Sequence, residues 1–153
     1  MALLVVLVAL VPGVWWVSYT RLVAARSDVD DSWAEVDAEL LRRYELATRI
    51  VETASATSDP DRIEELIHWL DAAVAAPRTP EAANEFEPPL GEAIDRLAGP
   101  ILRDRLDDVD DRIAVAGSFY NTRVEQLDRR VRAFASGFVA RRHGFERATF
   151  FEF

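Results

Sequence analysis

The feature that most constrains the fold is one unbroken helical pattern from Met1 to about Thr57. It begins with 17 residues, Met1 to Val17, that include no charged side chain, and it continues into an amphipathic stretch. About 20 apolar residues, each rising about 1.5 Å, are enough to cross a bilayer. The pattern therefore predicts that a membrane anchor over residues 1–18 and the first helix of a bundle form one rod.

The end of the apolar run has the composition of a membrane interface. Trp15, Trp16 and Tyr19 cluster there and are followed by Arg21 and Arg26, as in an interfacial aromatic belt. A cleaved signal peptide is the alternative interpretation, but no basic residue precedes the apolar run, which favours an anchor. Because the arginines follow the run, the positive-inside rule favours a cell-membrane protein with its N-terminus outside and its bundle in the cytoplasm.

The rest of the chain, residues 19–153, has the size of one compact domain. The sequence has no cysteine, which excludes disulfides, thiolate zinc sites and cysteine nucleophiles. The net charge of −9 argues against nucleic acid as a partner, since phosphate binding requires a clustered basic surface. An acidic domain of this kind is also expected to be repelled by an anionic leaflet.

Apolar residues at spacings of three and four predict helices along this domain. Ser58-Asp59-Pro60 has the composition of a helix cap and first turn. Residues 77–89 contain four of the seven prolines and predict a loop, and Gly137 and Gly144 are expected to loosen the C-terminal end. We therefore expect helices over residues 19–57, 60–76, 89–98 and 101–136, and an aromatic tail over residues 137–153.

Two long apolar stripes, one near each end of the domain, are able to pair along their length. The predicted fold is all-α: an elongated antiparallel helical bundle with an N-terminal transmembrane helix continuous with the first bundle helix. The aromatic residues on these stripes are expected in the core, and they are Trp33, Tyr44, Tyr120 and Phe134.

Polar residues beside these stripes suggest contacts between the helices. Arg42 and Arg43 are adjacent and cannot face the same way on a helix. We expect one of them to pair with an acid of the last helix, such as Asp128 or Glu125, and the other to be exposed. Tyr120 and Asn121 are interpreted as a polar pair in which Asn121 forms an inter-helix hydrogen bond that sets the register.

The inventory of catalytic residues is small and predicts no enzyme. Glu65 and His68 have the Glu-x-x-His spacing found in di-iron bundles, but the second copy of that motif is missing, because His143 has no matching glutamate. The acidic runs at residues 28–31 and 107–111 are interpreted as solvated faces. A metal-binding or enzymatic bundle that uses Glu65, His68 and these acidic clusters is the alternative hypothesis.

Two segments resemble the LemA family. Tyr19 to Thr53 does so through Arg42-Arg43-Tyr44, and Arg112 to Phe153 does so through Arg112-Ile113-Ala114, Tyr120-Asn121, Gly144-Phe145 and Phe151-Glu152. The resemblance implies a bacterial single-pass membrane protein with an elongated antiparallel bundle, no defined biochemical activity and no cofactor. Residues 47–49 depart from the family pattern, because Ala-Thr-Arg replaces Ile-Pro-Asn, and residues 58–100 match it poorly.

The aromatic tail is the most promising interaction surface, and it has two interpretations. Its phenylalanines either cap the apolar end of the bundle or form, with nearby arginines, a patch that contacts lipid head groups or a membrane partner. The expected function is a membrane-tethered helical interaction or scaffold module. Its partners would be the lipid bilayer, through residues 1–18, and an unidentified protein or a second copy of the chain. The residues of the surface are Phe145, Phe150, Phe151, Phe153, Arg141 and Arg142.

Overall fold

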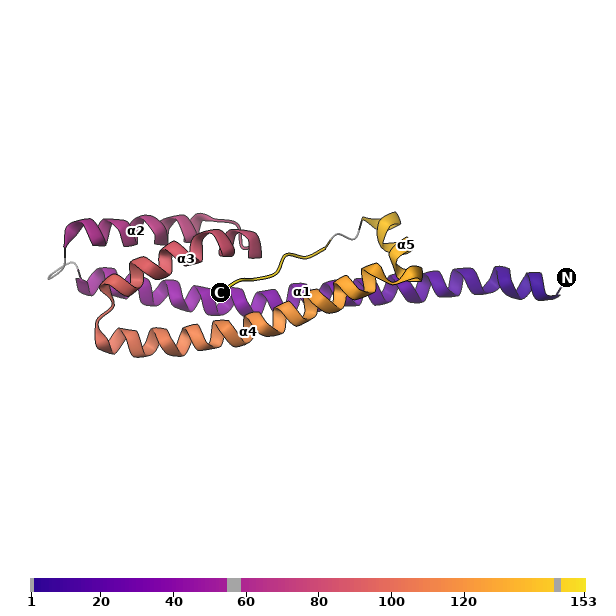
Figure 1. The fold of residues 1–153 in the computed structure, drawn as a ribbon, viewed down its shortest axis with the longest axis horizontal. Helices are drawn as coiled ribbons and strands as arrows, with labels where there is room; N and C mark the ends of the chain where they lie inside the picture. Colours follow the sequence, from indigo (N-terminus) through magenta and orange to yellow (C-terminus); the bar gives the residue numbers. More distant parts are fainter. Residues whose placement is uncertain (1, 55–58, 145–146) are drawn as a thin grey trace.

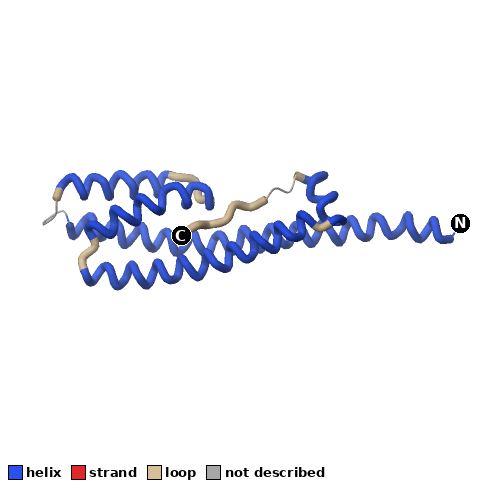
Figure 2. The backbone as a smooth tube through the Cα atoms, in the orientation of Figure 1, coloured by secondary structure: helices blue, strands red, loops and turns tan. Residues whose placement is uncertain are grey.

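The protein is seen in a computed structural model that describes the backbone of residues 2–54, 59–144 and 147–153. Side chains are described for these residues except for 2–11 and 134–138. This part of the chain is helical and contains no strand (Figure 2), so the all-α fold is confirmed. Its helices are α1 (Ala2–Ala54), α2 (Pro60–Ala75), α3 (Pro80–Leu97), α4 (Pro100–Arg132) and α5 (Phe134–His143).

Helix α1 is a single helix of 53 residues that runs through Pro12 without a break. The apolar segment and the first bundle helix are therefore one rod, as the sequence predicts. The N-terminal part of α1 extends beyond the other helices (Figure 1). Within the part of the chain that the structure describes, no helical stretch is long and apolar enough to span a bilayer. The side chains of residues 1–11, within the expected anchor, lie outside that part.

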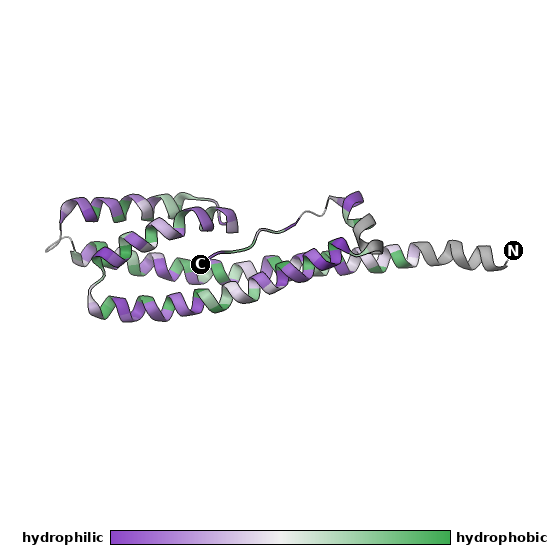
Figure 3. Cartoon of the chain, viewed as in Figure 1, coloured by the Kyte–Doolittle hydropathy of each residue, from purple (hydrophilic) through white to green (hydrophobic). Residues whose placement is uncertain are grey.

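Helices α1 and α4 lie side by side and antiparallel (Figure 1). Arg130 near the end of α4 donates a hydrogen bond to the backbone oxygen of Arg21 (3.2 Å), while Arg43 further along α1 pairs with Asp110. Hydrophobic residues are interspersed with hydrophilic ones along both helices (Figure 3), so each helix buries one stripe. The buried stripe of α4 is Leu106, Val109, Ile113, Gly117, Tyr120, Val124 and Leu127.

Helices α2 and α3 form a hairpin over the C-terminal half of α1 (Figure 1). The side chain of Asp59 caps α2 by accepting a hydrogen bond from the backbone NH of Asp61, and Pro60 lies in the first turn, so the predicted start of this helix is confirmed. The indole of Trp33 donates a hydrogen bond to the backbone oxygen of Arg78 (2.9 Å). This bond fixes the turn of the hairpin against α1.

The expected loop over residues 77–89 is wrong, because α3 begins at Pro80 and continues through Pro88 and Pro89. The Thr79 side chain caps the helix by accepting a hydrogen bond from the NH of Ala82 (3.3 Å). Each internal proline removes one backbone donor from the helix. The buried face nevertheless keeps its spacing of three and four across the prolines, so packing outweighs the lost bonds. Its residues are Ala83, Glu87, Leu90, Ala93 and Ile94.

The expected helix over residues 101–136 is also wrong at its end. Helix α4 stops at Arg132, the backbone turns at Ala133 (φ −62°, ψ 140°), and α5 follows. Gly137 lies within α5, whereas Gly144 ends it with φ 67°, a conformation that glycine adopts without strain. The described residues after it, 147–153, are not helical and run back toward the middle of α1 (Figure 1).

Candidate functional site

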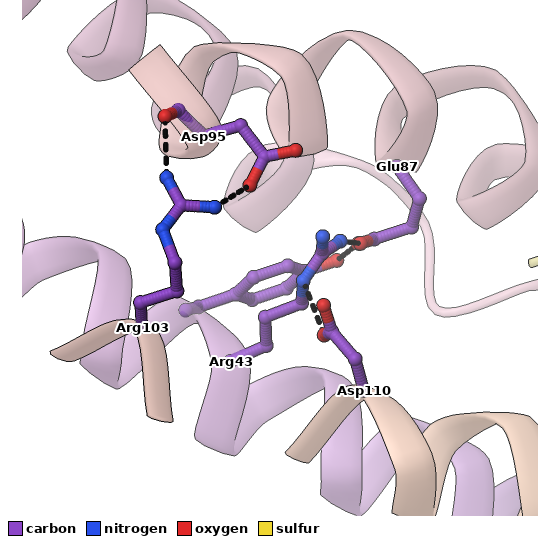
Figure 4. Close-up of polar contacts among 6 residues, drawn as sticks. Arg43, Glu87, Asp95, Arg103 and Asp110 are labelled. Carbon is purple, nitrogen blue, oxygen red and sulfur yellow. Dashed lines mark hydrogen bonds and ion pairs between the residues drawn. The ribbon is translucent and has the colours of Figure 1, made fainter. Parts of the chain in front are cut away.

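Four polar side chains from three helices meet inside the bundle (Figure 4). Arg43 and Tyr44 come from α1, Glu87 from α3 and Asp110 from α4. Arg43 Nη1 lies 2.5 Å from Glu87 Oε2, and Arg43 Nε lies 3.0 Å from Asp110 Oδ1. The Tyr44 hydroxyl donates a hydrogen bond to Glu87 Oε1 (2.5 Å). We call these four residues the buried ion-pair cluster.

Two members of the cluster, Arg43 and Glu87, are buried and are only 6 % and 2 % exposed. Burial raises the pKa of the Tyr44 hydroxyl, and the neighbouring Glu87 charge raises it further. Burial also raises the pKa of Asp110, an effect that the Arg43 charge opposes. Both carboxylate oxygens of Glu87 are bound by protein groups, so the arrangement is suited to holding three helices in register rather than to binding a substrate.

Arg43 is thus the buried arginine of the adjacent pair, and it pairs with an acid of the helix expected over residues 101–136, as predicted, although this acid is Asp110 and neither of the two named examples. Arg42 is exposed and pairs with Glu39 (2.7 Å). The antiparallel register places Arg43 opposite Asp110, whereas Glu125 and Asp128 lie further along α4 and pair with other arginines. Glu87 could not be found from the sequence, because the prolines around it predicted a loop.

Two asparagines hold the backbone of the C-terminal segment 147–153. Asn121 of α4 donates to the backbone oxygen of Phe151 (2.8 Å) and accepts from its NH (2.9 Å). Asn84 of α3 donates to the backbone oxygen of Phe150 (2.8 Å) and accepts from the NH of Glu152 (2.9 Å). We call this arrangement the asparagine clamp.

The clamp binds the tail as a neighbouring strand would. In an extended chain, successive residues present their NH and C=O groups to opposite sides, so the two asparagines grip the two edges of the segment. The hydroxyl of Tyr120 adds a hydrogen bond to the backbone oxygen of Thr149 (2.7 Å). The Asn121 bond expected between helices therefore goes to the tail instead, and Tyr120 makes a similar contact.

Phe151 anchors the tail in the bundle core. It is 3 % exposed, and its ring lies 5.7 Å from that of Trp33, in an edge-on arrangement. The Phe153 ring stacks on Phe151 at 5.9 Å, and the guanidinium carbon of Arg43 lies 5.0 Å from the centre of the Phe153 ring. The tail is thereby connected to the buried ion-pair cluster through a cation–π contact.

The expected interaction residues that the structure describes do not lie together on one surface. Phe151 is buried, while Phe150 and Phe153 are about half exposed beside it. Arg141 and Arg142 are exposed on α5. The following residue, His143, packs against Tyr19 at 5.0 Å between ring centres, close to the N-terminal part of α1. Phe145 lies outside the described residues.

Glu65 and His68, which the alternative hypothesis assigns to a metal site, contact other side chains of the protein. Glu65 accepts two hydrogen bonds from Arg96 (2.6 and 2.7 Å), and His68 packs against Trp69. The acidic runs at residues 28–31 and 107–111 are exposed apart from their valines and the partly buried Asp110. Within the described part of the chain, no group of three or more His, Cys, Asp or Glu residues is placed to hold a metal ion.

Comparison with known proteins bears on the C-terminal part of the chain. No curated protein matches the chain. The LemA family model matches residues 100–153, which comprise α4, α5 and the clamped tail. This range includes the second of the two segments that suggested the same family, with Tyr120, Asn121 and Phe151. The resemblance to the LemA family is therefore confirmed over residues 100–153.

Proposed function

We propose that the protein is a membrane-tethered helical interaction module. Residues 1–18 cross the bilayer, and the bundle presents binding surfaces to other proteins at a fixed distance from it. The observation that carries this proposal is the continuity of α1 over 53 residues. Because α1 is not interrupted between the apolar segment and the bundle, the height of the bundle above the membrane would be set by the helix itself, at about 1.5 Å per residue.

The residues around the expected interface support this arrangement. Trp15, Trp16 and Tyr19 lie where an aromatic belt is needed, and Arg21 and Arg26 follow. The positions of these arginines favour an N-terminus outside the cell and a bundle in the cytoplasm. The buried ion-pair cluster would keep the bundle rigid, since it ties α1 to both α3 and α4.

The bundle also exposes apolar side chains that its own core does not use. Val115 and Phe119 lie one turn apart on α4 and are 58 % and 63 % exposed. Phe150 of the tail is also about half exposed. An interaction module requires exposed anchors of this kind, whereas it requires no catalytic group or cofactor. The partner would be another protein or a second copy of the chain.

Membrane insertion is tested by extracting cell membranes with alkaline carbonate. The full-length protein should remain in the membrane pellet, and a variant lacking residues 1–18 should be released. Protease added from outside intact cells should leave the bundle uncleaved if it faces the cytoplasm. Release of the full-length protein by carbonate would overturn the tethering, and cleavage from outside would reverse the orientation.

Protein interaction is tested by crosslinking in intact cells, followed by quantitative mass spectrometry. We expect the same crosslinked partner peptides in replicate cultures of the full-length protein, and their loss in the variant lacking residues 1–18. Phe119→Ser should reduce them, whereas Ile67→Ser, which alters an exposed apolar residue of α2, serves as the matched control. Crosslinks between copies alone would identify homo-assembly, and no crosslinks above background would overturn the proposal.

A further inference from the structure

Arginines from two antiparallel helices converge where α4 ends beside α1. Arg21 of α1 and Arg129 and Arg130 of α4 line a hollow of about 670 Å³, together with Ser18, Leu22, Gln126 and Ala133. Arg130 also donates a hydrogen bond to the backbone oxygen of Arg21 (3.2 Å), which positions its guanidinium group across the two helices. We call this feature the arginine hollow.

The region around the hollow is basic, although the whole chain has a net charge of −9. Residues 12–26 and 126–144 contain seven arginines and one acidic residue, Asp128. Three of these arginines pair with acidic side chains: Arg132 with Asp128, which also pairs with Arg147, Arg129 with Glu125 (3.1 Å), and Arg26 with Asp30 (3.2 Å), which lies just outside these ranges. Positive charge from segments far apart in the sequence is therefore concentrated at one end of an acidic molecule.

The hollow also lies at a defined place along α1. Ser18 and Arg21 follow Trp16 by two and five residues, which corresponds to about 3 Å and 8 Å along the helix axis. If the tryptophans sit at the membrane interface, the hollow lies at the depth of the lipid head groups. This step rests on the proposed membrane insertion of residues 1–18.

We propose that the arginine hollow binds the phosphate head group of an anionic phospholipid in the leaflet nearest the bundle. Guanidinium groups bind phosphate oxygens in a planar, two-pronged geometry, and Arg21, Arg129 and Arg130 supply such donors on both sides of the hollow. The acidic composition predicts repulsion from an anionic leaflet, but the folded structure turns its basic end toward that leaflet and holds the acidic remainder away. The bound lipid would fix the angle at which the bundle leaves the membrane.

The test uses the full-length protein in nanodiscs of phosphatidylcholine with or without phosphatidylglycerol. Native mass spectrometry should show phosphatidylglycerol retained by the protein in preference to phosphatidylcholine. The double variant Arg129→Gln/Arg130→Gln should lose this preference several-fold. The control Arg103→Gln/Arg105→Gln removes the same charge from the opposite end of α4 and should retain it. Circular dichroism checks that both variants keep their helix content.

Three outcomes would overturn the lipid site. The first is equal retention of both lipids by the unaltered protein, and the second is an equal loss of preference in the two double variants. Displacement of the retained lipid by inorganic phosphate would identify a general phosphate site and would also overturn the lipid assignment. Carbonate extraction of the same variants reports on insertion separately, so a failure of the lipid site is distinguishable from a failure of membrane tethering.

Discussion

The ring of Phe151 lies directly over Gly117, so closely that a Cβ atom added to the glycine would be 2.8 Å from Cδ1 of the ring. Gly117 is in the middle of α4, where glycine is intrinsically less favourable than alanine by about 1 kcal/mol. The absence of a side chain at this position is thus what allows the tail to enter the core. The contact joins an extended C-terminal segment to a helix that begins some fifty residues earlier.

We expect Gly117→Ala to destabilise the protein by about 1–3 kcal/mol, because the added methyl group overpacks a buried contact. The measurement is the free energy of unfolding from urea denaturation. In a Phe151→Ala background the ring is gone, so the same glycine substitution should instead stabilise the helix by up to about 1 kcal/mol. The same sign of effect in both backgrounds would show that the Phe151 contact is not the cause.

Each asparagine of the clamp should protect a different backbone NH of the tail. Asn121→Leu leaves the NH and C=O of Phe151 without their partner, which should cost about 1–3 kcal/mol and speed hydrogen exchange at the Phe151 NH. Asn84→Leu should instead speed exchange at the NH of Glu152. Amide exchange measured by NMR distinguishes the two. Unchanged exchange and unchanged thermal stability in both variants would contradict the clamp.

Removing one member of the buried ion-pair cluster should lower the stability of the protein more than removing two. Arg43→Met leaves the Glu87 carboxylate buried without its charged partner, and we expect a loss of about 3–5 kcal/mol. The double variant Arg43→Met/Glu87→Met should recover part of this loss, because no unpaired charge remains between α1 and α3. Urea denaturation of the unaltered protein, the single variants Arg43→Met and Glu87→Met, and the double variant gives the coupling energy. Additive losses would show that the two residues are not coupled.

The protein should lose stability in alkaline solution through Tyr120. Burial raises the pKa of Tyr120 from 10.0 to about 12, and the Glu81 charge adds to this effect. The folded state therefore holds the phenolic proton more tightly than the unfolded chain. The stability that this group contributes is complete below pH 10 and is lost as the pH rises toward about 12.

Urea denaturation on either side of pH 10 measures this dependence. Tyr120→Phe should be less stable at neutral pH, because it loses the hydrogen bond to Thr149, and its stability should fall less steeply with rising pH. Part of the decline should remain, since the pKa of Tyr44 is also raised. An identical slope in the variant and the unaltered protein would contradict the contribution of Tyr120.

The local pattern of residues was sufficient to predict the helices that depend on it. The start of α2 was predictable because Asp59 and Pro60 act on their own backbone. The long stripe of α1 was predictable because burial repeats every three or four residues, from Leu22 to Ala54. Tyr44 and Tyr120 are buried as expected, Trp33 is partly buried, and the side chain of Phe134 lies outside the described part of the chain.

The predictions made from the sequence differ from the structure where packing between distant segments outweighed a local signal. Pro88 and Pro89 predicted a loop, but α3 stays helical through them, because its buried face continues on both sides. One of the adjacent arginines was expected to pair with an acid of the last helix, such as Asp128 or Glu125, and the antiparallel register of α1 and α4 gives Arg43 a different acid of that helix, Asp110. Neither the continuation of α3 through its prolines nor the register of α1 against α4 can be predicted from neighbouring residues in the sequence.

By itself, the sequence determined that this chain is helical, that its first helix continues an apolar segment, and which faces of the long helices are buried. These properties follow from side-chain periodicity and from capping residues within a few positions of each other. Only the tertiary structure decided that segment 147–153 returns to the core between Asn84 and Asn121, and that Arg21 faces Arg129 and Arg130. The physical reason is that these contacts join residues far apart in the chain, and their partners are set by how the helices pack.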